Sequence, residues 1–222
     1  QSGISIIDVT NGQLGAVTPL VTSADTDDGS YHFYPTWSPD AKYIAFVTSW
    51  DPNIVNGNYL GSVGNAHGVL RMVEVAKAPV TCPGPDCIEL TRGTGYAPSA
   101  AQSQSGTQGS TWPKFAPFAQ GSGSVYFITY TARRQYGLYP DITSQLWMFG
   151  IDTTLSGDPS FPPFWLPYQD IRDGSLSPYW TETLPCEADV EADTCEGCLE
   201  EEYCQVNEAR TSCACVARSV IR

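Results

Sequence analysis

The sequence lacks the short motifs that mark most enzyme active sites. It contains no Gly-x-Ser-x-Gly nucleophile elbow, no His-Glu-x-x-His metal motif, no phosphate-binding loop and no haem-attachment motif. Its two histidines, His32 and His67, stand in unrelated segments, which leaves little material for a histidine-based triad or metal site. We therefore expect this chain to have no enzymatic activity of its own.

The sequence also lacks a long apolar run and an excess of basic residues. No stretch of about 18 apolar residues occurs, so we expect no transmembrane helix. Only 11 residues are Lys or Arg, against 24 Asp or Glu, which gives a formal net charge of −13. Such an acidic chain repels phosphate backbones, so nucleic acid is not an expected partner. The charge does not exclude protein or glycan partners that are neutral, cationic or bridged by calcium.

Charged residues are scarce, at 16%, while the chain has 20 glycines and 17 prolines. This composition favours many short strands joined by turns over long helices, and no helical periodicity is evident before residue 186. We therefore expect an all-β fold.

Three landmarks recur in the same order and predict a tandem repeat. A Pro-x-aromatic-x-Pro turn is followed by an apolar second strand, then by a third and a fourth strand. The turns are Pro35–Pro39 and Pro113–Pro117, with a weaker copy at Ser177–Thr181; the second strands are Ile44–Thr48 and Val125–Thr129, aligned in that order; the third strands are Ile4–Val9, Leu70–Val75 and Leu146–Ile151; the fourth are Gly15–Val21, Ile88–Thr91 and Phe164–Pro167. Four antiparallel strands per unit, repeated in tandem, are typical of β-propeller blades, although chance likeness within a β-sandwich is the alternative.

The segment Tyr34–Phe46, with its Pro-Thr-Trp-Ser-Pro-Asp-Ala core, resembles the P-x-W-S-P-D-G-x-x-I-A-F signature of TolB-type, WD40-like propeller repeats, the PD40 family. Ala41 replaces the usual glycine. The resemblance implies a propeller fold in a periplasmic, secreted or cell-surface protein, but no single function. We expect Trp37 and Phe115 to fill the space between stacked blades, and Pro39 and Asp40 to form a tight turn.

The predicted organisation is a partial blade (1–30), two blades (31–111 and 112–175), the start of a further blade (176–185) and a Cys-rich tail (186–222). Within this chain the propeller ring is incomplete. We expect further blades, or a separate protein partner, to complete it.

Eight cysteines, an even number, predict disulfides and an oxidising compartment. They are Cys82, Cys87, Cys186, Cys195, Cys198, Cys204, Cys213 and Cys215. Zinc held by the Cys195–Cys198 and Cys213–Cys215 pairs is the less favoured reading of the tail, because Cys-x-Cys makes a poor second zinc knuckle. The pairing within the tail is open, with 15 possibilities.

Long insertions at 50–67, 93–110 and 131–143 are the expected recognition loops. The candidate partner-binding residues are Trp50, Arg133, Arg134, Tyr136 and Tyr139, which combine guanidinium and aromatic groups. The spacing of Asp25, Asp27 and Asp28 is compatible with a calcium site, although an Asp-rich turn between blades is the commoner explanation. The leading hypothesis is a non-enzymatic propeller for protein binding, scaffolding or assembly. The alternatives are a gating propeller of a larger hydrolase or peptidase, and a glycan-binding propeller.

Overall fold

The computed structural model divides the chain into two units, Gln1–Trp180 and Thr181–Arg222. It describes residues 3–23, 31–49, 68–95, 109–119, 123–133, 143–170 and 172–180, with only the backbone at Ser23, and the backbone of 202–206 and 213–217. The smaller unit contributes one described hairpin, β12 (Glu202–Val206) paired antiparallel with β13 (Cys213–Ala217).

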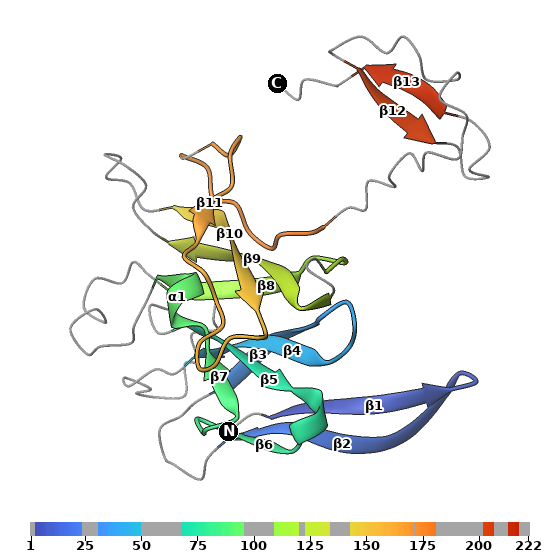
Figure 1. Ribbon diagram of the computed structural model, residues 1–222, viewed down its shortest axis with the longest axis vertical. Coiled ribbons are helices and arrows are strands. Elements are labelled where there is room, and N and C mark those ends of the chain that lie inside the picture. The colour runs from blue at the N-terminus through green and yellow to red at the C-terminus, as the bar shows by residue number, and fades with distance from the viewer. Residues whose placement is uncertain are drawn as a thin grey trace. The chain divides into compact units, whose positions relative to one another are not determined.

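The described residues of the larger unit form three β-sheets, which confirms the all-β prediction (Figure 1). Sheet I contains β1 (Ile4–Thr10), β2 (Gln13–Ser23) and β6 (Val80–Cys82); sheet II contains β3 (Tyr31–Trp37), β4 (Tyr43–Ser49), β5 (Val69–Glu74) and β7 (Cys87–Glu89); sheet III contains β8 (Ser110–Phe115), β9 (Val125–Arg133), β10 (Ser144–Asp152) and β11 (Phe164–Trp165). Sheets II and III are antiparallel throughout, whereas β6 joins β2 in parallel. The described helices are short, the 3-10 turn η1 (Val75–Lys77) and α1 (Thr91–Thr94).

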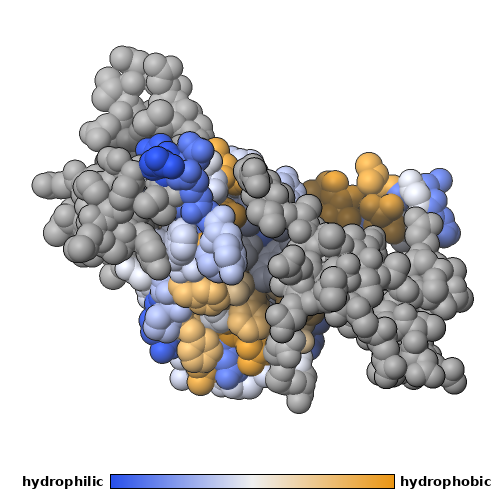
Figure 2. All heavy atoms as spheres, turned by 90° about the horizontal axis from the view of Figure 1, so that it is seen from above, coloured by the Kyte–Doolittle hydropathy of each residue, from blue (hydrophilic) through white to orange (hydrophobic). Residues whose placement is uncertain are grey.

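The order of the sheets along the stack follows from the burial of their strands. In β4 every residue after Tyr43 is buried, because sheet II has a neighbour on both faces. In β10 buried and half-buried residues alternate, as expected for a strand with one fully packed face. Sheet III therefore lies at one end of the stack, and Figure 2, a view from above, shows apolar side chains at the surface on that side.

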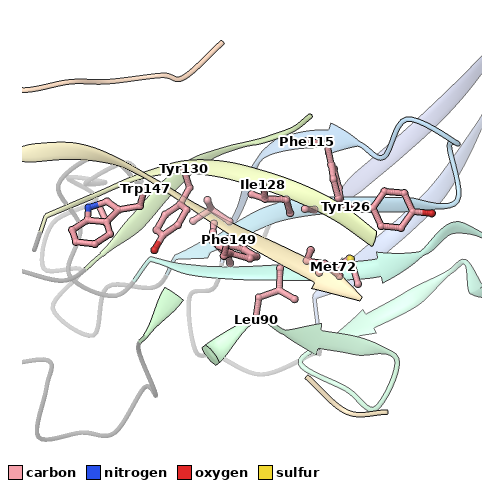
Figure 3. Close-up of a cluster of buried hydrophobic side chains, with 13 residues drawn as sticks. Met72, Leu90, Phe115, Tyr126, Ile128, Tyr130, Trp147 and Phe149 are labelled. Carbon is pink, nitrogen blue, oxygen red and sulfur yellow. The ribbon is translucent and has the colours of Figure 1, made fainter. Parts of the chain in front are cut away.

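Two apolar cores hold the stack together. The core between sheets II and III includes Met72 and Leu90 from one sheet and Phe115, Tyr126, Ile128, Tyr130 and Phe149 from the other (Figure 3). The core between sheets I and II includes Ile4, Leu20 and Val21 from sheet I and Ile44, Phe46 and Val73 from sheet II. Each sheet needs its neighbour, because a single sheet leaves an apolar face in water.

Matching backbone hydrogen bonds show that sheets II and III are two copies of one unit. Leu90 N donates to Leu70 O at 3.0 Å, and Leu166 N donates to Leu146 O at 3.1 Å. At the other end of each unit, Ser38 N donates to Tyr43 O at 2.9 Å, as Ala116 N does to Phe127 O at 2.8 Å. The predicted match of third strands, Leu70 with Leu146, agrees with this register.

The predicted residue-by-residue match of the second strands is wrong. Pairing with the third strands makes Ile44 equivalent to Ile128, since Ile44 faces Val73 and Ile128 faces Phe149. The prediction had matched Ile44 with Val125, a slip of three residues that would turn each side chain to the opposite face. The turn before this strand is longer in the second copy, and the sequence alignment did not allow for that.

The Pro-x-aromatic landmark is also misplaced in the prediction, because its first half lies within strands rather than turns. Pro35 belongs to β3 and Pro113 to β8, and each lies within a bulge in the pairing with the next strand. Phe115 is buried between sheets as predicted, but Trp37 is 46% exposed. Trp37 pairs with Ile44 and so faces sheet I, where the described residues include no strand opposite β3.

Candidate recognition edge

One edge of the stack gathers the strand ends that bound the long loops. At this edge, here called the loop edge, β3 begins at Tyr31, β4 ends at Ser49 and β9 ends at Arg133, while β5, β8 and β10 begin there (Figure 1). The segments 24–30, 50–67, 96–108 and 134–142 each adjoin one of these ends in the sequence. The antiparallel topology therefore directs all four segments from the same side of the molecule.

Sheets II and III are aligned along this edge by two contacts. Ser110 N donates to Gly68 O at 3.0 Å, which joins the start of β8 to the start of β5. The rings of Tyr34 and Trp112 stack with centroids 3.9 Å apart and planes 17° apart. The loop-edge ends of the two sheets therefore lie side by side rather than at different heights.

The stacked pair rests on an unusual backbone conformation that is repeated in both sheets. Tyr34 has φ +52° and Trp112 has φ +53°, and each directly precedes a proline. A non-glycine residue in the left-handed region is uncommon, and proline normally makes the preceding residue extended. An aromatic residue before each motif proline was the available sequence signal, and sequence reasoning missed it.

An aromatic row continues from this pair along β3. Tyr31 and Phe33 stack with centroids 6.4 Å apart, and the rings of Phe33 and Tyr34 lie 6.0 Å apart. Tyr31, Phe33 and Tyr34 are half-buried and lie on the first strand of sheet II. The row offers rigid apolar surface of the kind that protein-binding sites use.

Buried polar groups lie beneath the same edge, on the face of sheet II that packs against sheet I. His32 Nδ1 lies 3.0 Å from Thr48 Oγ1. Arg71, with a side chain 9% exposed, pairs with Glu89 at 3.3 Å through Nη2. Its Nη1 has no hydrogen-bond partner within the described part of the chain. Buried groups of this kind fix the positions of their strands more than they add stability.

Of the predicted partner-binding residues, the structure describes Arg133, which is exposed at the end of β9 on the loop edge. Trp50, Arg134, Tyr136 and Tyr139 lie outside the described residues, as do the predicted calcium ligands Asp25, Asp27 and Asp28. In the parts of the chain that are described, no group of three or more His, Cys, Asp or Glu residues is placed to hold a metal.

The predicted disulfide between Cys82 and Cys87 is present, with Cα atoms 5.4 Å apart. Cys204 lies directly opposite Cys215 in the β12–β13 pair, and Cys213 lies opposite Val206. The other tail cysteines, Cys186, Cys195 and Cys198, lie outside the described residues. Bridges within the tail stay a prediction. No helix among the described residues has the length and apolar character needed to cross a membrane.

The most strongly shifted acidic group is part of a joint between sheets, not of an active site. Burial raises the pKa of Asp40, but hydrogen bonds from Ser38, Lys42 and Tyr126 outweigh it and hold the pKa well below 3.8. Tyr126 Oη lies 2.9 Å from Asp40 Oδ2, across the interface from sheet III to sheet II. The predicted turn is confirmed here, since Lys42 N donates to Asp40 Oδ1 at 3.2 Å.

A second joint, Asp158, ties sheet III to α1. Burial raises the pKa of Asp158, but hydrogen bonds led by the Arg92 backbone N–H give a net lowering. Its Oδ2 accepts from Arg92 N at 2.7 Å and from Thr91 Oγ1 at 2.8 Å. Gly93 lies so close to Phe149 that a Cβ would come within 2.6 Å of that ring. Both shifted carboxylates are thus ionised structural groups.

Comparison with protein-family models, with curated proteins and with solved structures finds no match to this chain. The likeness of Tyr34–Phe46 to the PD40 signature therefore stays a prediction. The loop edge is the feature from which a function has to be inferred.

Proposed function

We propose that this chain is part of an exported β-propeller of the TolB-like, PD40 type, and that it binds a protein partner through its loop edge. The stack of repeated four-stranded sheets supports a propeller, in which sheets of this kind follow one another around an axis. The disulfide between Cys82 and Cys87 supports an oxidising compartment.

The single observation that carries the binding role is the convergence of strand ends on one edge. Long loops on a rigid scaffold are the usual place for recognition. Here the scaffold is rigid because the ends of sheets II and III are joined by the Ser110–Gly68 hydrogen bond and the Tyr34–Trp112 stack. The described strand ends beside four segments therefore lie at one edge, where a folded partner could contact them together.

The chemistry of the edge indicates the kind of partner. Arg133 is exposed there, and Arg134, Tyr136 and Tyr139 follow it in the sequence, within a chain of net charge −13. Arginine and tyrosine are enriched in the parts of interfaces that contribute most affinity. We expect the partner to present a carboxylate and apolar surface to this loop, and to carry no large negative charge elsewhere.

The test is selection of peptide ligands from a random displayed library against the immobilised chain, with a glycan array probed in parallel. We expect peptide ligands whose affinity falls about 30-fold, or 2 kcal/mol, in the Arg133→Ala/Arg134→Ala double variant. Ser156→Ala, an exposed change in the turn after β10 at the opposite edge, is the matched control and leaves affinity unchanged.

Two results would overturn the proposal. One is that the selected peptides lose affinity with Ser156→Ala but not with the arginine double variant. The other is binding on the glycan array with no peptide ligand, which would make the chain a glycan-binding propeller instead. Equal melting temperatures of the three proteins would show that loss of binding is not loss of fold.

A further inference from the structure

The outer face of sheet III carries apolar residues at the same positions as the face of sheet II that packs against sheet III. The hydrogen-bond register makes Leu146 equivalent to Leu70 and Leu166 equivalent to Leu90. It also makes Met148 equivalent to Met72, so three apolar residues recur unchanged. Leu70, Met72 and Leu90 are fully buried by sheet III, whereas their three equivalents are half-buried. We name this outer surface the forward face.

The edge of the forward face is also apolar. Phe164, the equivalent of Ile88, is 47% exposed, and Phe161 is 43% exposed. Figure 2, which looks down on this side of the stack, shows orange side chains gathered at the surface. An apolar surface at positions that are buried in the preceding copy indicates a docking site for a further sheet.

The chain itself already begins to cover this face in the repeated manner. Ser177 has φ +55° before Pro178, as Tyr34 and Trp112 have before their prolines. Trp180 Nε1 donates to Lys114 O at 3.2 Å, at the β8 position equivalent to Thr36 of β3. Thr36 Oγ1 in turn accepts from Phe115 N at 3.3 Å. Residues 177–180 therefore lie beside β8 as β8 lies beside β3.

The opposite end of the stack presents a complementary surface, here called the backward face. In β1, Ile4 and Ile6 pack against sheet II, so Ile7 points to the other side, where it is 44% exposed. Ile7 pairs with Val17 in the same way that Val73 pairs with Cys87 in sheet II. Val17 is 62% exposed. Val73 and its sheet III equivalent, Phe149, are fully buried in the two cores.

Both interfaces inside the chain join the forward side of one sheet to the backward side of the next. In the described stack, one surface of each type has no neighbouring sheet, and each carries apolar side chains at the positions that are buried in the inner interfaces. A contact between different surfaces of identical chains repeats until the rotation closes a ring. Two copies supply six sheets, which lies within the four to eight blades of propellers.

We propose that a second copy of this chain docks the backward face of its sheet I on the forward face of sheet III, head to tail, so that two copies complete one ring. This inference rests on the propeller organisation proposed above, but not on the loop edge. Residues 177–180 of each copy would then lie at the inner side of the incoming sheet.

The experiment is native mass spectrometry of the full chain, with size analysis over a range of micromolar concentrations. We expect a dimer of twice 24.1 kDa. Phe164→Lys on the forward face and Ile7→Lys on the backward face should each give a monomer, because each change enters both interfaces of the ring. Leu155→Lys, an exposed apolar site in the turn after β10, is the control and stays dimeric.

Mixing the two monomeric variants provides the decisive result. The mixture should form a heterodimer, since one of its two interfaces then contains only unaltered faces. A monomeric wild type, a dimer that resists either lysine, or a mixture that stays monomeric would overturn the proposal. The Arg133→Ala/Arg134→Ala variant should stay dimeric, so loss of loop-edge binding and loss of the dimer are separate outcomes. A retained β-sheet circular dichroism spectrum and cooperative melting of the lysine variants would show that each still folds, at a melting temperature below that of the dimer.

Discussion

The hydrogen bond between Tyr126 and Asp40 allows the joint between sheets II and III to be tested by a single atom. Tyr126→Phe removes one hydroxyl and keeps a ring that is 1% exposed within the core. A hydrogen bond to a charged group contributes about 1.5–3 kcal/mol to stability. The same hydroxyl also lies 2.7 Å from Gly123 O, so the single change removes both contacts and the double variant isolates the one to Asp40. We place the expected loss at about 1.5 kcal/mol, because Asp40 keeps the bond from Ser38 Oγ at 2.8 Å and the one from Lys42 N.

The assays are urea unfolding and thermal unfolding, both followed by tryptophan fluorescence, of the wild type, Tyr126→Phe, Asp40→Ala and the double variant. We expect Tyr126→Phe to lower the melting temperature by about 3–6 °C, since about 2–4 °C is lost per kcal/mol in a chain of this size. The two changes should be non-additive by about 1 kcal/mol, because each removes the same hydrogen bond.

The stability that Asp40 contributes should decrease on acidification. Since the pKa of Asp40 in the folded protein is below 3.8, the folded state binds fewer protons than the unfolded state near that pH. The stability from Asp40 is therefore fully present above about pH 5 and falls as the pH drops toward the folded pKa. The coupling between Tyr126 and Asp40 should shrink in the same range. A coupling below about 0.5 kcal/mol at neutral pH, or one that grows on acidification, would refute the joint.

Two further predictions concern the backbone near these joints. Ala41 has φ +57°, so Ala41→Gly should raise the free energy of unfolding, measured in urea, by about 0.5–1 kcal/mol. The control, Ala78→Gly, changes a residue with φ −61° and should lower the free energy of unfolding. The reverse order would contradict backbone strain at Ala41. Asp158→Ala should cost about 2 kcal/mol and speed amide hydrogen exchange at Arg92, which loses its acceptor; unchanged exchange there would contradict the joint to α1.

In sheets II and III the third strands could be predicted from the sequence residue by residue, and the fourth strands could be located. Leu70 matches Leu146, and Ile88 matches Phe164, as the register requires. These segments are short, apolar and bounded by turn residues, so their limits are visible in the sequence. The turn at Asp40 could also be predicted from the sequence, because its Ser-Pro-Asp residues form local hydrogen bonds.

The second strands could not be aligned in the same way, for a physical reason. In β4 both faces are buried, so Ile44, Ala45, Phe46 and Val47 show no alternation that identifies a face. An apolar run without alternation can slide along its counterpart at no cost in sequence similarity. Only the pairing with the third strand fixes the register, and that pairing involves residues distant in the sequence.

The loop edge lay beyond sequence reasoning for a related reason. Arg133 could be recognised as a candidate, but nothing in the sequence indicates that the ends of β4, β5 and β8 lie at the same edge. That placement depends on the Ser110–Gly68 hydrogen bond and on the stacking of Tyr34 with Trp112. Both contacts join residues of different repeats, so neither belongs to a local motif.

The residue before each motif proline has the same left-handed backbone conformation in all three copies. The residue differs between copies, being Tyr34, Trp112 and Ser177, while φ stays between +52° and +55°. The conformation is therefore a property of the repeat rather than of one side chain. Each such residue costs on the order of 1–3 kcal/mol. Contacts between sheets, such as the stack of Tyr34 on Trp112, help to offset this cost. The same stacking that stabilises the bulges aligns the strand ends, and the loop edge exists only in the assembled stack.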